Sequence, residues 1–313
     1  MKKILTIASY LIGFGALSLQ ADLLIYEGFN YSGVRSDGDS MDNVTSNATG
    51  LTGSYNLLHS TGASITFKTT GLSFGSNFLS TSDGGIYLDG GTTYSVLEMS
   101  LNTPYDSPTT YQGTIYSSYL GKVTSMAGDE GLFTSRVANE SGASYTRRFN
   151  SELDGRSDSG PAVGYGEDTT AASSGALTLD ETYLVLARFT HVGETDAELG
   201  GETRTADQFV FTLSAYENWL AAGGVEGDLG TYASFTASDT NTIYEKHFHN
   251  GYQVEIGIAP LGGSGNETAY FDELRYGTTL ADVVSVVPEP SSFLLMAGGM
   301  LLVGFGAFKR RHS

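Results

Sequence analysis

Short stretches in which apolar and polar residues alternate recur along most of this 313-residue chain. The clearest stretches lie at 64–68, 114–116, 183–189, 208–213 and 252–258, and each is bounded by Gly, Asp, Asn, Ser or Thr. Because successive side chains of a strand point to opposite faces, a period of two predicts strands that bury one face. We therefore expect an all-β fold, an antiparallel two-sheet sandwich.

The composition agrees with many short strands and turns. Glycine accounts for 41 residues, whereas Asp, Glu, Lys and Arg together make up only 16% of the chain. Residues 96–101 fit a helix or a strand by pattern, and their neighbours favour a strand. The only helices expected are short, for example at 215–222 around Trp219. Because no internal repeat or Pro/Ser-rich linker interrupts residues 22–287, we expect them to form one domain.

Cysteine content and charge exclude several classes of function. The chain has no cysteine, which excludes disulfides, thiol catalysis and zinc sites that require Cys. Residues 22–287 hold 11 Lys and Arg against 34 Asp and Glu, a net charge of −23. Such a domain repels phosphate backbones, so we expect no nucleic-acid partner. Cation binding and contact with neutral glycans stay open.

The first 21 residues have the pattern of a secretory signal peptide. Lys2 and Lys3 precede an apolar run from Ile4 to Leu17, and a small residue, Ala21, follows. We expect cleavage after Ala21. The alternative is a membrane anchor, but 14 helical residues extend only ~21 Å, less than a hydrocarbon core of ~30 Å.

The last residues combine three features in a fixed order. Pro288, Glu289 and Pro290 come first, residues 293–308 follow without a charge, and Lys309, Arg310 and Arg311 come next. The prolines keep the first part extended, as a protease site requires. The apolar run is expected to enter the membrane as a short helix, with the basic residues held on the cytoplasmic side. The alternative is an ordinary C-terminal membrane helix.

This order at 288–313 closely resembles the PEP-CTERM sorting signal of Gram-negative bacteria. The resemblance implies that an exosortase, a membrane-embedded enzyme, recognises the tail and removes it during export. It further implies an exported protein that is anchored transiently in the inner membrane. The expected final location is the cell envelope, the outer surface or the extracellular matrix.

Three segments of the body resemble strands of concanavalin A-like (laminin-G-like) jelly-roll domains. They are Leu23 to Phe29, the hairpin pattern from Tyr183 to Leu213, and Phe271 to Thr279, in that order. The resemblance implies a jelly-roll form of the sandwich. It also implies association with exopolysaccharide as the role of the exported domain. A lectin-like module with a defined glycan site is the alternative.

One group of acidic residues has the spacing of a catalytic strand. Glu194, Asp196 and Glu198 match the Glu-x-Asp-x-Glu strand of jelly-roll β-glucanases, in which ~6.6 Å separates successive acids on one face. Gly193 before them and Gly200 after them instead favour a charged loop between two strands. We therefore expect no catalytic residue and no enzymatic activity. A glycoside hydrolase that uses Glu194 and Glu198 is the less favoured alternative.

Two further groups contain residues that ligate metals. Glu245, His247 and His249 could share one strand face and offer ligands to a transition metal. The loop at 37–43 offers three carboxylates to calcium, but it lacks the Asp-x-Asp-x-Asp-Gly order of an EF-hand. We interpret both groups as surface residues and expect no cofactor. Calcium at 37–43 is the alternative, and it would accompany a lectin-like function.

Overall fold

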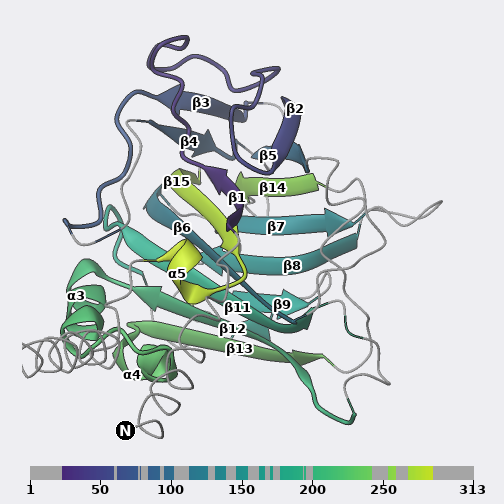
Figure 1. Ribbon diagram of the computed structural model, residues 1–313. Helices are drawn as coiled ribbons and strands as arrows, with labels where there is room; N and C mark the ends of the chain where they lie inside the picture. Colours follow the sequence, from purple (N-terminus) through teal and green to yellow (C-terminus); the bar gives the residue numbers. More distant parts are fainter. Residues whose placement is uncertain are drawn as a thin grey trace, which may run out of the picture.

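A computed structural model provides the structure of the chain. It describes residues 23–59, 62–76, 78, 84–91, 95–101, 113–125, 131–138, 146–153, 162–165, 170–171, 177–192, 194, 200–241, 253–258 and 267–284. These residues form two antiparallel β-sheets with a small set of helices on one side (Figure 1).

The larger sheet contains eight strands and includes the first and last strands of the described chain. Its order is β13 (Phe235–Asn241), β12 (Arg204–Phe211), β11 (Tyr183–Val192), β6 (Gly113–Ser125), β15 (Thr268–Gly277), β4 (Gly85–Asp89) and β3 (Ser64–Lys68). The eighth strand, β1 (Leu23–Glu27), pairs with β15. β15 thus bonds to three strands, and it joins β1, β4 and β6 into one sheet.

The smaller sheet contains seven strands. Its order is β10 (Thr170–Ala171), β9 (Ala162–Tyr165), β8 (Thr146–Leu153), β7 (Leu132–Ala138), β14 (Gln253–Ile258), β5 (Ser95–Leu101) and β2 (Leu51–His59). Every pairing between the strands of both sheets is antiparallel. The predicted all-β, antiparallel two-sheet fold is confirmed.

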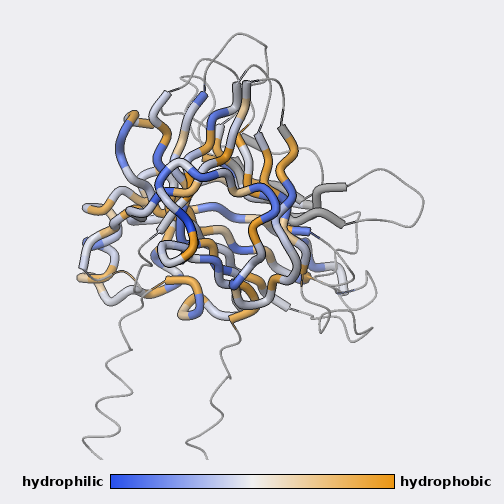
Figure 2. The backbone as a smooth tube through the Cα atoms, turned by 90° about the horizontal axis from the view of Figure 1, so that it is seen from above, coloured by the Kyte–Doolittle hydropathy of each residue, from blue (hydrophilic) through white to orange (hydrophobic). Residues whose placement is uncertain are grey.

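The main hydrophobic core lies between the two sheets. Phe271 on β15 and Tyr119 on β6 stack with ring centroids 4.7 Å apart, and both side chains are buried. Met99 and Ile256 contribute to the same core from the smaller sheet. Along β3, buried and half-buried residues alternate, and hydrophobic and hydrophilic segments are interspersed through the body in Figure 2. This is the alternation from which the sequence predicted strands.

A buried glutamine joins the two sheets by hydrogen bonds. The Gln208 side chain on β12 accepts a bond of 2.7 Å from the Ser151 hydroxyl on β8. It also donates a bond of 2.7 Å to the backbone carbonyl of Glu152. Because these polar groups are buried, the glutamine satisfies groups that would otherwise cost free energy in the core.

A second core covers the outer face of the larger sheet. It is built from α3 (Leu213–Ala221), α4 (Leu229–Tyr232), α5 (Leu280–Val283) and the apolar side chains of Leu72, Phe74 and Phe78. The short helix η2 (Glu226–Asp228) lies between α3 and α4 in the chain and has no buried residue. Trp219 of α3 is fully buried in this second core, and its indole N–H donates a bond of 2.9 Å to the Val225 carbonyl. Leu184 and Leu186 of β11 face this layer, so β11 is buried on both faces. Among the residues that the structure describes, no helix has the length and apolar character needed to cross a membrane.

The ends of one predicted strand and one predicted helix were wrong. The strand expected at 208–213 ends at Phe211, and the helix expected at 215–222 runs from Leu213 to Ala221. Thr212 explains the difference, because its hydroxyl accepts a bond of 3.3 Å from the backbone N–H of Ala215. This contact is an N-cap, and it starts the helix directly after the cap residue.

Candidate functional site

The described body ends in a short helix that is held firmly against the larger sheet. Thr279 and Asp282 form a capping box, in which the Thr279 backbone N–H donates a bond of 2.8 Å to the Asp282 carboxylate. The carbonyl of Val283 accepts a bond of 2.6 Å from the Ser118 hydroxyl on β6. Val283 and Val284 are both fully buried. The packed body therefore continues to the last described residue before the tail.

The start of the described chain lies beside this end of the body. Leu23, the first residue of β1, is opposite Gly277, the last residue of β15 (Figure 1). Gly277 lets the chain turn closely into α5, because a Cβ there would lie 2.3 Å from the Cβ of Asp282. The first and last strands of the described chain thus pair directly with each other. The sequence signals at 1–21 and 288–313 lie outside the described residues.

Glu194 lies in the hairpin loop and not on a strand. β11 ends at Val192 and β12 begins at Arg204, so Glu194 belongs to the connection between them. Its carboxylate lies 2.8 Å from Nδ1 of His191, whose Nε2 lies 3.2 Å from the carboxylate of Glu202. A histidine therefore bridges two acids of the loop. Asp196 and Glu198 lie outside the described residues, so no described contact brings the three acids together on one strand.

The carboxylates of the loop at 37–43 point to separate partners. Asp37 contacts Lys68 and the backbone N–H of Thr69, at 3.3 and 3.2 Å. Asp39 accepts a bond of 2.8 Å from the backbone N–H of Ser36. Across the part of the chain that the structure describes, no group of three or more His, Asp or Glu side chains could hold a metal ion. Glu245, His247 and His249 lie outside that part.

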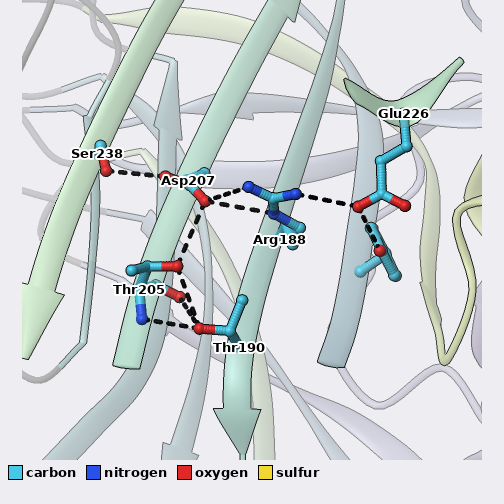
Figure 3. A network of polar contacts seen from close by, with 7 residues as sticks. Arg188, Thr190, Thr205, Asp207, Glu226 and Ser238 are labelled. Atoms are coloured by element: carbon cyan, nitrogen blue, oxygen red, sulfur yellow. Dashed lines mark hydrogen bonds and ion pairs between the residues drawn. The ribbon is translucent and has the colours of Figure 1, made fainter. Parts of the chain in front are cut away.

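An ion-pair network fixes η2 to the outer face of the larger sheet (Figure 3). Arg188 on β11 lies between Asp207 on β12, at 2.7 Å, and Glu226 of η2, at 3.0 Å. Tyr116 on β6 donates a bond of 2.7 Å to the same Glu226 carboxylate, and Ser238 on β13 donates one of 2.8 Å to Asp207. Burial acts to lower the pKa of Arg188, but its hydrogen bonds to the two acids outweigh burial and raise it. Each of these groups is thus paired within the network, which ties η2 to β6, β11 and β12.

A second polar cluster is buried beneath the N-terminal strand. Glu27, the last residue of β1, has no exposed surface. Its carboxylate accepts hydrogen bonds from the hydroxyls of Tyr31 and Tyr55 and from the backbone N–H of Phe29. Burial raises the pKa of Glu27 to about 7, and these hydrogen bonds act in the opposite direction. Such a carboxyl group is largely protonated in mildly acidic solution.

Two further acids lie near Glu27 at a bulge in β15. Asp272 accepts a bond of 2.8 Å from the backbone N–H of Leu72, and burial raises its pKa well above the usual value. Glu273 has a positive φ of 58° and pairs with Arg275 at 2.9 Å. A perturbed pKa often marks a functional site. The side chains of Glu27 and Asp272 are, however, fully buried, and so is that of Glu273. None of the three acids faces a substrate in this conformation.

Comparison with protein families decides what the tail is. Residues 286–311 match the PEP-CTERM protein-sorting motif. The chain carries a PEP-CTERM sorting motif. The match begins two residues after Val284, so the motif directly follows the packed end of the body. Its residues include Pro288, Glu289, Pro290 and the basic residues 309–311.

Comparisons of the whole chain find only distant similarity. No curated protein matches it. Peanut lectin with a bound peptide is 12% identical, over 69% of this chain and 97% of the lectin, with a TM-score of 0.37. Winged bean acidic lectin with methyl-α-D-galactose is 11% identical, over 75% and 100%, with a TM-score of 0.38. A protein of unknown function from Shewanella oneidensis MR-1 is 13% identical, over 87% and 95%, with a TM-score of 0.39. At these values the matches carry no inference about ligands.

Proposed function

We propose that this chain is an exported, non-enzymatic β-sandwich protein that reaches the Gram-negative cell envelope or the extracellular matrix through its PEP-CTERM tail. An exosortase recognises Pro288, Glu289 and Pro290 and removes the tail. Before that step, the apolar run at 293–308 holds the protein in the inner membrane. The basic residues Lys309, Arg310 and Arg311 keep the end of the tail on the cytoplasmic side. The released or retained sandwich then associates with exopolysaccharide.

The observation that carries this proposal is the match to the sorting motif directly after a packed domain end. Val284 is buried against the larger sheet, and the motif begins at residue 286. The tail therefore contributes no strand or helix to the described sandwich. Cleavage near the motif would leave both sheets and both described cores intact. A removable sorting signal requires this separation between the folded body and the tail.

The test replaces Pro288, Glu289 and Pro290 with alanine in a host that encodes an exosortase. We expect the variant to remain an uncleaved, membrane-bound precursor, because the extended recognition segment is lost. Mass spectrometry of envelope and culture fractions identifies the C-terminus of each form. As a control, alanines at the exposed residues Ser32, Val34 and Ser36 should leave processing unchanged.

A second chain that stops after Ser285 separates sorting from folding. We expect it to be exported as a soluble sandwich, because it keeps every described strand and helix. Deletion of the exosortase gene should have the same effect on the full chain as the alanine triplet. A mature wild-type protein that still ends at Ser313 in an exosortase-containing host would overturn the proposal.

A further inference from the structure

Two tyrosines lie side by side on the outer face of the larger sheet. Tyr87 on β4 and Tyr270 on β15 are directly opposite each other in the strand register. Their ring centroids are 5.0 Å apart, and the ring planes meet at 59°. Both side chains are half-buried, whereas most of the described tyrosines are buried, and Tyr270 also packs against the edge of the second core. The sequence alone could not separate these two rings from the tyrosines of the core.

Two lysines flank this pair. Nζ of Lys122 on β6 lies 4.5 Å from the centroid of the Tyr270 ring, and Lys122 is the register partner of Tyr270. Nζ of Lys68 on β3 lies 5.5 Å from the centroid of the Tyr87 ring. We call these four residues the tyrosine–lysine surface. Residues 22–287 contain only three lysines, so two of the three gather at this one place.

The tyrosine–lysine surface forms a row across four neighbouring strands. The strands are β3, β4, β15 and β6, which are consecutive in the sheet. Three interstrand spacings of about 4.8 Å give the row a length of about 14 Å. The helices α3 and α4 lie toward β11, β12 and β13, at the other end of the sheet (Figure 1). A row of this length suits an extended chain better than a single small molecule.

The chemistry of the row combines apolar rings with mobile hydrogen-bond donors. A lysine held against a ring keeps its charge and its three N–H donors, because the ring does not neutralise it. The tyrosine hydroxyls add groups that both donate and accept. Acceptors lie close by, since Asp37 pairs with Lys68 at 3.3 Å and Asp89 follows Tyr87 by two residues on β4. Sugar rings have apolar C–H faces and hydroxyl edges, which match these two kinds of group.

We propose that the tyrosine–lysine surface binds a neutral polysaccharide chain. The rings contact the faces of successive sugars, and the lysine ammonium groups donate hydrogen bonds to their hydroxyls. The net charge of −23 over residues 22–287 opposes a polyanion, and Asp37 beside Lys68 leaves little positive charge at that end of the row. The inference rests on the exopolysaccharide association proposed above and assigns it to one surface.

The experiment measures migration of the full chain, purified in a non-glycosidic detergent, through native gels that contain a soluble polysaccharide. The probes are the neutral polymers dextran, barley β-glucan and galactomannan, with alginate as an acidic polymer. We expect retardation by at least one neutral polymer and none by alginate. Retardation by alginate alone would overturn the neutral class, and free migration in all four gels would overturn the site.

Variants then test whether the four residues carry the binding. Tyr87→Ala and Tyr270→Ala should each weaken binding by about tenfold, because truncation of an aromatic contact residue commonly has an effect of this size. Tyr270→Phe should retain most of the binding, since it keeps the ring. Tyr232→Ala removes another half-buried tyrosine, on α4, and should leave binding unchanged. Equal binding by wild type and the two surface variants would overturn the proposal.

A lysine variant tests the same surface if a tyrosine variant fails to fold. If a Tyr→Ala variant loses its far-ultraviolet circular dichroism, Lys122→Met replaces it, because methionine keeps an apolar stem against the Tyr270 ring. We expect binding to weaken by about threefold or more, with unchanged dichroism and melting temperature. Unchanged binding by this variant would exclude the lysine from the site. These readouts do not depend on tail cleavage, so failure here and failure of the sorting proposal are distinguishable.

Discussion

Substitution of Glu27 by Gln should make the sandwich less sensitive to pH. The Glu27 carboxyl group is fully buried, and burial raises its pKa from 4.5 to about 7. The folded protein therefore holds a proton on Glu27 that the unfolded chain releases at lower pH. Glutamine has nearly the same shape and cannot ionise, so it removes this one difference between the two states.

The sign and size of the effect follow from proton linkage. Because the pKa of Glu27 is higher in the folded state, its contribution to stability is fully present below pH 4.5 and is lost as the pH rises toward 7. The interval from 4.5 to about 7, at about 1.4 kcal/mol for each pH unit, corresponds to about 3 kcal/mol. The wild type should lose this stability between pH 4 and pH 8, and Glu27→Gln should not.

The assay compares urea unfolding of the two proteins, as residues 22–285, at pH 4 and pH 8. We expect the difference in unfolding free energy, variant minus wild type, to increase by about 3 kcal/mol from pH 4 to pH 8. Glu217→Gln changes an exposed acid on α3 and should show no such increase. A difference that stays the same at both pH values would refute the reasoning, because Glu27 would then ionise equally in the folded and unfolded states.

Two further predictions concern the cores. Trp219→Ala should lower the unfolding free energy by about 3–5 kcal/mol, since it empties a fully buried site beneath α3, whereas Glu217→Ala should change it by less than about 0.5 kcal/mol. Gln208→Ala should cost about 1–3 kcal/mol, because the buried Ser151 hydroxyl and the Glu152 carbonyl each lose a hydrogen bond to the glutamine side chain. Urea denaturation measures both, and a loss below 1 kcal/mol in either variant would contradict the assigned packing.

The sequence predicted the strands well where only one face is buried. Residues 64–68 are a strand with the predicted bounds, and the buried side chains alternate along it. A short helix around Trp219 was predicted, but the sequence did not predict that helices cover the outer face of the larger sheet. In β11, Leu184 and Leu186 face the helices while Val185 and Ala187 face the other sheet. A continuous apolar run of this kind indicates burial on both faces.

The polar clusters could not be predicted from the sequence, because their members are distant along the chain. Tyr26 and Glu273 are 247 residues apart, yet the hydroxyl and carboxylate lie 3.4 Å from each other. Tyr87 and Tyr270 likewise meet only because β4 pairs with β15. Local sequence patterns indicate the periodicity of apolar side chains and the positions of turns, whereas the order of strands in the sheet decides which distant side chains become neighbours. By contrast, the sorting tail is a contiguous segment, so the motif at 286–311 could be recognised from local sequence.

The position of β15 makes closure of the larger sheet depend on one of the last segments of the body. β15 lies between β6 and β4 and also pairs with β1, the first described strand, so the larger sheet cannot close until residues 268–277 are present. Pairing of the first strand with the last is a contact of the longest range, and such contacts form slowly. In an exported chain, residues 268–277 emerge immediately before the sorting motif at 286–311. On the proposed export route, we therefore expect the sandwich to close while the tail is still in the membrane. Removal of the tail should then release a body that already holds its last strand.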